Sequence, residues 1–170
     1  MQTQNVSEKY YSITTNDQEL NKKPVSDFAE IWESKQTGAK SLHSRVEILP
    51  GDTIAKIGIR KYVEKPNYLS LQISDKQHIL LSPEYLQYIN HSCDPNIFFD
   101  TTEMVVRCLE KINIGEAITF FYPSTEWSME QGFNCLCGSK RCLREIKGAA
   151  YLSEDIIKRY QFNQHIISKL

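Results

Sequence analysis

The sequence has few glycines, and none of its seven stands two positions away from another. The Gly-x-Gly fingerprint that cradles phosphates in dinucleotide-binding domains is therefore absent. The phosphate-binding loop, the Gly-x-Ser-x-Gly elbow of hydrolases and the His-Glu-x-x-His helix of zinc proteases are missing as well. These absences remove the commonest nucleotide-binding, hydrolase and zinc-protease classes.

Charge bias and long apolar runs are also lacking. With 20 basic and 21 acidic residues, the formal net charge is -1, so the composition offers no chain-wide attraction to nucleic acid or to an anionic membrane. No stretch approaches the roughly 18 apolar residues of a membrane span, and the first 20 residues are polar. We therefore expect an intracellular protein, cytoplasmic or nuclear and not secreted, with no direct nucleic-acid or membrane partner.

Cysteine is sparse, with five in 170 residues, but three of the five stand close together. So few cysteines make a poor disulfide framework for a secreted scaffold, which favours reduced thiols. Cys135, Cys137 and Cys142 form a Cys-x-Cys-x4-Cys pattern around a turn of small residues, so their thiolates can converge on one cation. The pattern indicates three zinc ligands from one loop, with free thiols as the alternative.

A closed structural zinc site needs a fourth ligand from elsewhere in the chain. Cys93 precedes an Asp-Pro turn, whereas Cys108 lies in an apolar run typical of a core strand. We therefore predict Cys93 as the fourth ligand and Cys108 as a core residue. His91 is a weaker candidate.

The apolar pattern predicts one mainly β domain, because 170 residues with 41% hydrophobic content suffice for a single core. Alternation predicts a hairpin over residues 46–59, and further strands at 68–73, 78–81 and 104–109, with a helical turn over 82–88. Residues 112–118 repeat the pattern of 48–54 (Ile, two residues, Gly, acid, one residue, Ile), which two hairpins with similar turns would explain.

Helices are predicted only near the ends of the chain. Ser26 or Asp27 is a candidate cap for a short helix before Gly38. At the other end, Ser153 is a good N-cap, and the isoleucines and the tyrosine of residues 156–167 can share one helical face. We expect a single C-terminal helix there.

Two further segments carry chemistry. Residues 88–96 read Tyr-Ile-Asn-His-Ser-Cys-Asp-Pro-Asn, and residues 114–122 read Ile-Gly-Glu-Ala-Ile-Thr-Phe-Phe-Tyr. Together with the cysteines of 135–142, and in this order, they resemble the signature motifs of SET-domain lysine methyltransferases that carry a post-SET zinc loop. Residues 40–51 more weakly resemble the cofactor segment of that family, so the resemblance runs from about residue 38 to residue 148.

The resemblance implies a fold, an organisation and a set of partners. The fold is mostly β with short helices, with small β-sheets around a knot-like crossing, a post-SET zinc loop and a C-terminal helix. The expected division is an N-terminal extension (1–35), a SET domain (36–125), the post-SET zinc loop (126–150) and the C-terminal helix (151–170). The cofactors are S-adenosylmethionine and Zn²⁺, and the partner is a lysine-containing protein or peptide substrate.

The same resemblance assigns roles to individual residues. Tyr122 is implied as the catalytic tyrosine. The implied cofactor-binding residues are Lys40, Ser41, Leu42, Asn90, His91 and Tyr122. The implied walls of the substrate channel are Phe120 and Phe121, and the implied zinc ligands are Cys93, Cys135, Cys137 and Cys142.

The implied activity is methyl transfer from S-adenosylmethionine to a lysine amine of a protein. Because a free lysine has a pKa near 10.4, an apolar aromatic channel is needed to favour the neutral amine. The chain departs from the family pattern at four places: Ala39 and Ser41 replace a glycine pair, Gln87 replaces an arginine, Phe121 replaces an aspartate, and Arg144 replaces a glycine. The alternatives are a methyltransferase acting on a small amine or peptide, and a catalytically silent, zinc-stabilised SET interaction module.

Overall fold

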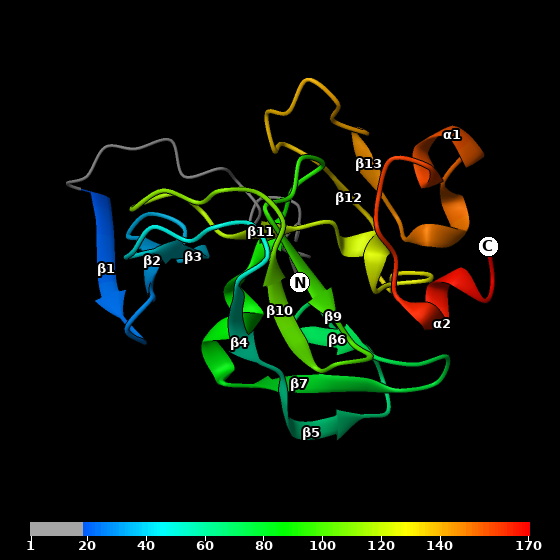
Figure 1. Cartoon of the computed structure of the whole chain (residues 1–170), viewed down its shortest axis with the longest axis horizontal. Coiled ribbons are helices and arrows are strands. Elements are labelled where there is room, and N and C mark those ends of the chain that lie inside the picture. The colour runs from blue at the N-terminus through cyan, green and yellow to red at the C-terminus, as the bar shows by residue number, and fades with distance from the viewer. Residues whose placement is uncertain (1–18) are drawn as a thin grey trace, which may run out of the picture.

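The computed structural model describes residues 19–170. In this part of the chain, strands form three sheets of three strands and two sheets of two strands, and all helices are short (Figure 1). The predicted fold class, mostly β with short helices, is confirmed. The knot-like crossing and the division into four segments stay predictions.

The three-stranded sheets have the orders β1-β2-β3, β4-β10-β9 and β5-β7-β6, and the two-stranded sheets pair β11 with β8 and β12 with β13. The strands are β1 (Leu20–Pro24), β2 (Ala29–Ser34), β3 (Lys40–Ser44), β4 (Thr53–Lys56), β5 (Gly58–Val63), β6 (Ser70–Gln72), β7 (His78–Ser82), β8 (Asn90–His91), β9 (Ile97–Asp100), β10 (Val105–Cys108), β11 (Thr119–Phe120), β12 (Phe133–Asn134) and β13 (Glu145–Ile146). The helices are η3 (Glu84–Tyr88), η4 (Tyr122–Ser124), η5 (Ala149–Tyr151), α1 (Glu154–Ile157) and α2 (Gln164–Ile167).

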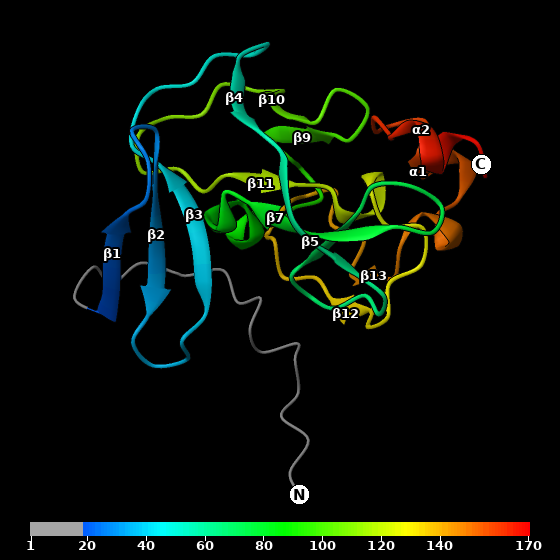
Figure 2. The ribbon, with the colours of Figure 1, turned by 90° about the horizontal axis from the view of Figure 1, so that it is seen from below.

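The sheet β1-β2-β3 lies at one end of the molecule, opposite α1 and α2 (Figure 2). The helix predicted before Gly38 is wrong, because residues 29–34 form the central strand of this sheet. Ser26 does act as a cap, but its Oγ accepts the Ala29 N–H at 3.1 Å in the turn between β1 and β2. The β-branched and aromatic pair Ile31 and Trp32 fits a strand better than a helix.

The repeated segments 48–54 and 112–118 bind each other reciprocally. The Ile48 N–H donates to the Ile112 carbonyl and the Ile112 N–H donates to the Ile48 carbonyl, both at 3.0 Å. Each turn contains a glycine at positive φ, Gly51 (92°) and Gly115 (80°), a conformation that glycine adopts without steric cost. The two segments are therefore similar in backbone structure as well as in amino-acid sequence.

These turns do not close the predicted hairpins. Strand β4 follows the first turn but pairs with β10, which precedes the second turn. Reciprocally, the segment after the second turn bonds to β3, which precedes the first, since the Ile118 N–H donates to the Leu42 carbonyl at 2.8 Å. The hairpin over residues 46–59 is thus wrong, because the two repeats exchange partners.

The C-terminal segment is not the single helix that the sequence predicts. It contains two helices of four residues, α1 and α2. The residues between them include Phe162 and Asn163, whose side chains are buried. Ser153 occupies the N-cap position of α1, but its side chain makes no capping bond. Ile166 is fully buried whereas the neighbouring Ile167 is 51% exposed, so the isoleucines do not share one continuous face.

Strands predicted at 68–73, 78–81 and 104–109, and the helical turn over 82–88, correspond to β6, β7, β10 and η3. They pack around a main core, whose largest fully buried residue is Phe99. A second, smaller cluster of Phe121, Ala149, Phe162 and Ile166 attaches the C-terminal segment. The buried residues of the sites described below, among them Cys93 and Tyr122, belong to the main core.

Candidate active site and metal centre

The two sequence motifs meet because β8 and β11 pair in parallel. Asn90 is opposite Thr119 and His91 is opposite Phe120, and the Ser92 N–H donates to the Phe120 carbonyl at 3.0 Å. Residues about 30 positions apart in sequence are therefore neighbours. This pairing places the heptapeptide 90–96 beside Tyr122.

Asn96 strengthens the contact from within the same heptapeptide. Its Nδ2 donates to the Ala117 carbonyl at 2.8 Å, and its Oδ1 accepts the Thr119 N–H at 2.8 Å. The side chain is 8% exposed, so these bonds replace those that water would supply. Sequence reasoning gave Asn96 no role, because nothing in its position indicates which distant backbone it serves.

Asn90 connects the heptapeptide to β3, in which Lys40, Ser41 and Leu42 are the predicted cofactor residues. Its Nδ2 donates to the Lys40 carbonyl at 3.0 Å. Among the hydrogen bonds within residues 19–170, none reaches the Asn90 Oδ1. The predicted cofactor residues of both segments are thus brought together.

His91 contacts both the cysteines and the predicted catalytic residue. Its Nδ1 accepts the Tyr122 backbone N–H at 3.2 Å, and its Nε2 lies 3.2 Å from Cys93 Sγ. A backbone N–H can only donate, so Nδ1 carries no proton and the Nε2–H donates to sulfur. Burial lowers the pKa of His91 to about 3, which keeps the ring neutral.

Tyr122 is the first residue of η4 and is 8% exposed. Its hydroxyl donates to the Ile89 carbonyl at 3.4 Å. Its ring packs against His91 edge to face at 5.2 Å and against Phe120 at 4.6 Å. The tyrosine is therefore held by its backbone, its ring and its hydroxyl.

A cavity of about 680 Å³ opens beside Tyr122, within the usual size range of small-ligand sites. Apolar side chains form most of its inner wall, and the polar ones include the carboxylates of Glu126 and Glu130. The apolar lining residues are Pro66, Tyr68, Leu69, Leu71, Leu81, Leu86, Ile89, Phe99, Phe120, Tyr122, Met129 and Phe133. The Glu126 carboxylate has partners within the protein, because it accepts the Gln72 N–H at 2.8 Å and contacts His78 Nε2 at 3.3 Å.

Phe120 lines this cavity as predicted for the channel, but Phe121 does not. Consecutive residues of an extended segment point to opposite sides, so the ring of Phe121 enters the smaller core instead. There it stacks on Tyr160, with ring centroids 3.7 Å apart and planes 7° apart. Phe121 therefore does not line this cavity, and its assignment to the substrate channel stays a prediction.

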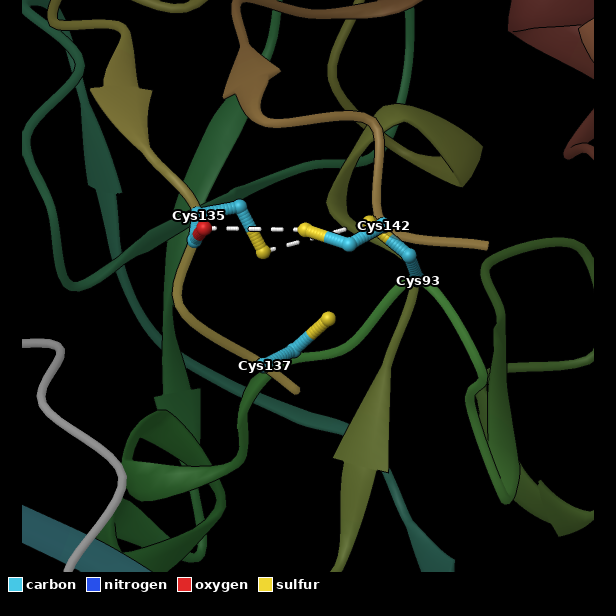
Figure 3. Close-up of side chains that lie close together, drawn as sticks. All are labelled: Cys93, Cys135, Cys137 and Cys142. Carbon is cyan, nitrogen blue, oxygen red and sulfur yellow. Dashed lines mark hydrogen bonds between the residues drawn. The ribbon is translucent and has the colours of Figure 1, made fainter. Parts of the chain in front are cut away.

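The four cysteines predicted as zinc ligands converge in space (Figure 3). Their Sγ atoms all lie within 4.8 Å of one another, and those of Cys93 and Cys135 are 3.9 Å apart. Sulfur atoms of a tetrahedral site with Zn–S bonds of about 2.3 Å are about 3.8 Å apart. The cluster thus fits Zn²⁺, and Cys108 lies outside it, donating from its Sγ to the Glu110 carbonyl.

Hydrogen-bond donors surround these sulfurs as well. The Leu143 N–H donates to Cys93 Sγ at 3.4 Å, beside the bond from His91. The hydrogen bond with Cys93, together with burial, raises the pKa of the Cys135 thiol above its usual value. Four neighbouring thiolates need a cation to offset their repulsion, and N–H donors to sulfur are typical of metal–thiolate sites.

Arg144 closes the cysteine loop in a strained conformation. It stands where the family pattern has glycine, yet its φ is 69°, in the left-handed region. Its carbonyl accepts the Cys135 N–H at 2.6 Å, which fixes this backbone geometry. A non-glycine residue in this region costs on the order of 1 kcal/mol.

Arg144→Gly is therefore expected to stabilise the protein by about 1 kcal/mol, raising Tm by roughly 2–4 °C. Thermal unfolding of the zinc-loaded protein measures the change. Lys140→Gly is the matched control, because Lys140 lies in the same loop without positive φ and should lose stability. An equal or lower Tm for Arg144→Gly would show that the strain is absent.

Comparison with known proteins identifies the family. A model described as "SET domain" matches residues 4–123. The chain belongs to the SET-domain family of methyltransferases. No helix in residues 19–170 is both long and apolar enough to cross a membrane.

Two curated relatives match the chain to different extents. "Methyltransferase flvH" of Aspergillus flavus is 38% identical over 128 residues, which cover 74% of this chain and 71% of the relative. "Histone-lysine N-methyltransferase set9" of Schizosaccharomyces pombe is 35% identical over 72 residues, covering 41% of this chain but only 15% of the relative.

Among solved structures, the fold resembles that of KRYPTONITE in complex with mCHH DNA, an H3(1-15) peptide and SAH. The TM-score is 0.51 at 20% identity, covering 68% of this chain and 28% of that one. This likeness confirms the SET fold. The chain covers only 28% of the KRYPTONITE chain and 15% of set9. The activities of those whole proteins are therefore not assigned to this chain.

Proposed function

We propose that the protein transfers methyl groups from S-adenosylmethionine to a lysine side-chain amine of a protein. The observation that carries this proposal is the position of Tyr122. It lies at the inner wall of a largely apolar cavity and is bonded through His91 to the heptapeptide that binds cofactor in the family. When bound, the cofactor supplies an activated methyl group on a sulfonium.

The residues of the cavity suit a lysine amine. Phe120 and Phe133, the apolar residues next to Tyr122, penalise an ammonium and favour the neutral amine, which is the nucleophile. The Glu126 and Glu130 carboxylates of the same cavity attract the charged form as it enters. The Tyr122 hydroxyl can orient that amine, and the packing of Tyr122 against Phe120 and His91 restricts the directions available to it. Asn90, which is bonded to the Lys40 carbonyl, is proposed to accept a bond from the cofactor's amino group at its Oδ1.

Zn²⁺ is proposed as a structural ion held by Cys93, Cys135, Cys137 and Cys142. All four sulfurs are protein ligands, which leaves no open position for a substrate or water. Its role is therefore to fix residues 133–147 against the heptapeptide.

Methyl-labelled S-adenosylmethionine, offered with a cell lysate and separately with a metabolite extract, tests the proposal. We expect label on lysine in protein, located by mass spectrometry. Tyr122→Phe should lower the rate about 100-fold through loss of the orienting hydroxyl. Tyr62→Phe, at an exposed position outside the cavity, should have no effect.

Two results would contradict the proposal in different ways. Label confined to the metabolite extract would identify a methyltransferase of small amines or peptides. Cofactor binding without any transfer would identify a silent interaction module.

A further inference from the structure

The C-terminal segment contacts the site through Tyr160, a residue outside the sequence motifs. This side chain makes two contacts. Its hydroxyl donates to the carbonyl of Cys93 at 2.8 Å. Its ring stacks on Phe121, the residue immediately before Tyr122. One side chain thus contacts both the metal cluster and the segment that carries the predicted catalytic tyrosine.

Tyr160 and His91 connect the same two segments through different atoms. His91 joins the Cys93 sulfur to the Tyr122 backbone, whereas Tyr160 joins the Cys93 carbonyl to the Phe121 ring. His91 and Phe121 also pack together, with ring centroids 5.7 Å apart. The two motif segments are therefore bridged twice.

The stack depends on Phe121, where the chain departs from the family pattern described above. Phe121 replaces the aspartate of the family pattern, and a carboxylate could not stack on a tyrosine ring. Phe121 is 2% exposed, and Phe162 contacts its other edge with ring planes 77° apart. Tyr160 lies beyond residue 123, where the family match ends.

The backbone around Tyr160 is rigidly held. Three positions later, Asn163 donates to the carbonyls of Phe99 and Ser124 and accepts the N–H of Thr101. Because this segment is anchored, the side chain of Tyr160 can restrict the movement of Cys93 and Phe121, the residues that it contacts.

We propose that Tyr160 is a positioning residue for methyl transfer, acting by holding the Cys93 backbone and the Phe121–Tyr122 segment in register. The inference rests on the proposed function. It assigns the C-terminal segment a role in the reaction besides completing the fold.

The test separates the hydroxyl from the ring. Tyr160→Phe removes only the bond to Cys93, whereas Tyr160→Leu removes the stack as well. Measured at a temperature where each variant is fully folded and zinc-loaded, kcat should fall about threefold and about tenfold, respectively, as expected for one hydrogen bond and for that bond plus a stacked pair. The KM for S-adenosylmethionine should stay within about twofold, because both variants keep the zinc-loaded cluster and therefore the bonds of His91 and Asn90.

A second readout needs no turnover. Zinc transfer to a chromophoric chelator should be several-fold faster in Tyr160→Phe, since the Cys93 carbonyl loses its partner. Tyr151→Phe is the matched control: Tyr151 lies in the same segment, is 63% exposed, and its hydroxyl bonds only to Ser128 among residues 19–170.

The outcomes distinguish the two proposals. Unchanged kcat per folded molecule in Tyr160→Leu would reduce Tyr160 to a stabilising residue and overturn the inference. If the wild-type protein transfers no methyl group, the proposed function fails, and zinc release alone then decides whether Tyr160 holds the cluster.

Discussion

Replacing Cys137 with serine is expected to release zinc and to unfold the segment of residues 133–147. Its regular secondary structure is small, because β12 and β13 form only two residue pairs, and apart from the metal it is held mainly by the burial of Phe133 and Ile146 in the main core. Structural zinc supplies binding free energy on the order of 10 kcal/mol in small domains, and that energy is coupled to folding. Loss of even about 3–5 kcal/mol should lower Tm by roughly 10 °C in a chain of this size.

Metal analysis and thermal unfolding of the same samples measure the two effects. Wild type should contain about one zinc per chain, and Cys93→Ser should match Cys137→Ser, as expected when each supplies one of four ligands. Cys108→Ser is the control, because Cys108 is buried but lies outside the cluster. Equal zinc content in Cys93→Ser and wild type would remove Cys93 from the site.

Metal loss should also weaken the binding of the cofactor. Cys93 and His91 belong to the same heptapeptide as Asn90, and His91 bonds to both Cys93 Sγ and the Tyr122 N–H. Without the metal, the sulfur that accepts the His91 N–H is free to move. We therefore expect weaker binding of S-adenosylmethionine in Cys137→Ser, although Cys137 contacts none of the predicted cofactor residues.

The fold class and the grouping of the four cysteines could be predicted from the sequence, whereas the roles of the individual site residues stay predictions. Zinc ligands and signature motifs are short segments in which the chemistry requires particular residue types. Cys93 and Tyr122 can therefore be recognised from the amino-acid sequence alone. Phe121 shows the limit of this reasoning. Its place within the motif indicated the channel, but the alternation of side chains at the end of β11 directs it to the opposite side.

The fold depends on pairings that sequence patterns do not encode. The repeats 48–54 and 112–118 were visible, and their glycine turns are real, but the exchange of strand partners between them was not predictable. A turn signal gives the local chain reversal, whereas the partner is chosen by packing between distant segments. Tyr160 and Asn163 were missed for the same reason, since their partners lie 39 to 67 residues away.

Asn163→Ala is expected to destabilise the protein by about 3–5 kcal/mol, because the removed amide leaves several buried groups without partners. Its Nδ2 bonds to the Phe99 and Ser124 carbonyls at 2.8 and 3.0 Å, and its Oδ1 accepts from the backbone and the hydroxyl of Thr101 at 2.8 and 2.9 Å. The residue is 3% exposed, so water does not replace these bonds in the folded state.

Asn163→Asp provides the sharper version of this experiment, because it keeps the shape of the side chain and changes only Nδ2. A carboxylate oxygen would then face the carbonyls of Phe99 and Ser124, so we expect at least the loss seen with alanine. Asn134→Ala, at an exposed position of β12, should leave Tm within about 2 °C. A similarly small change for Asn163→Ala would show that the C-terminal segment is held by its apolar residues alone, and Phe162 and Ile166 would then become the residues to substitute.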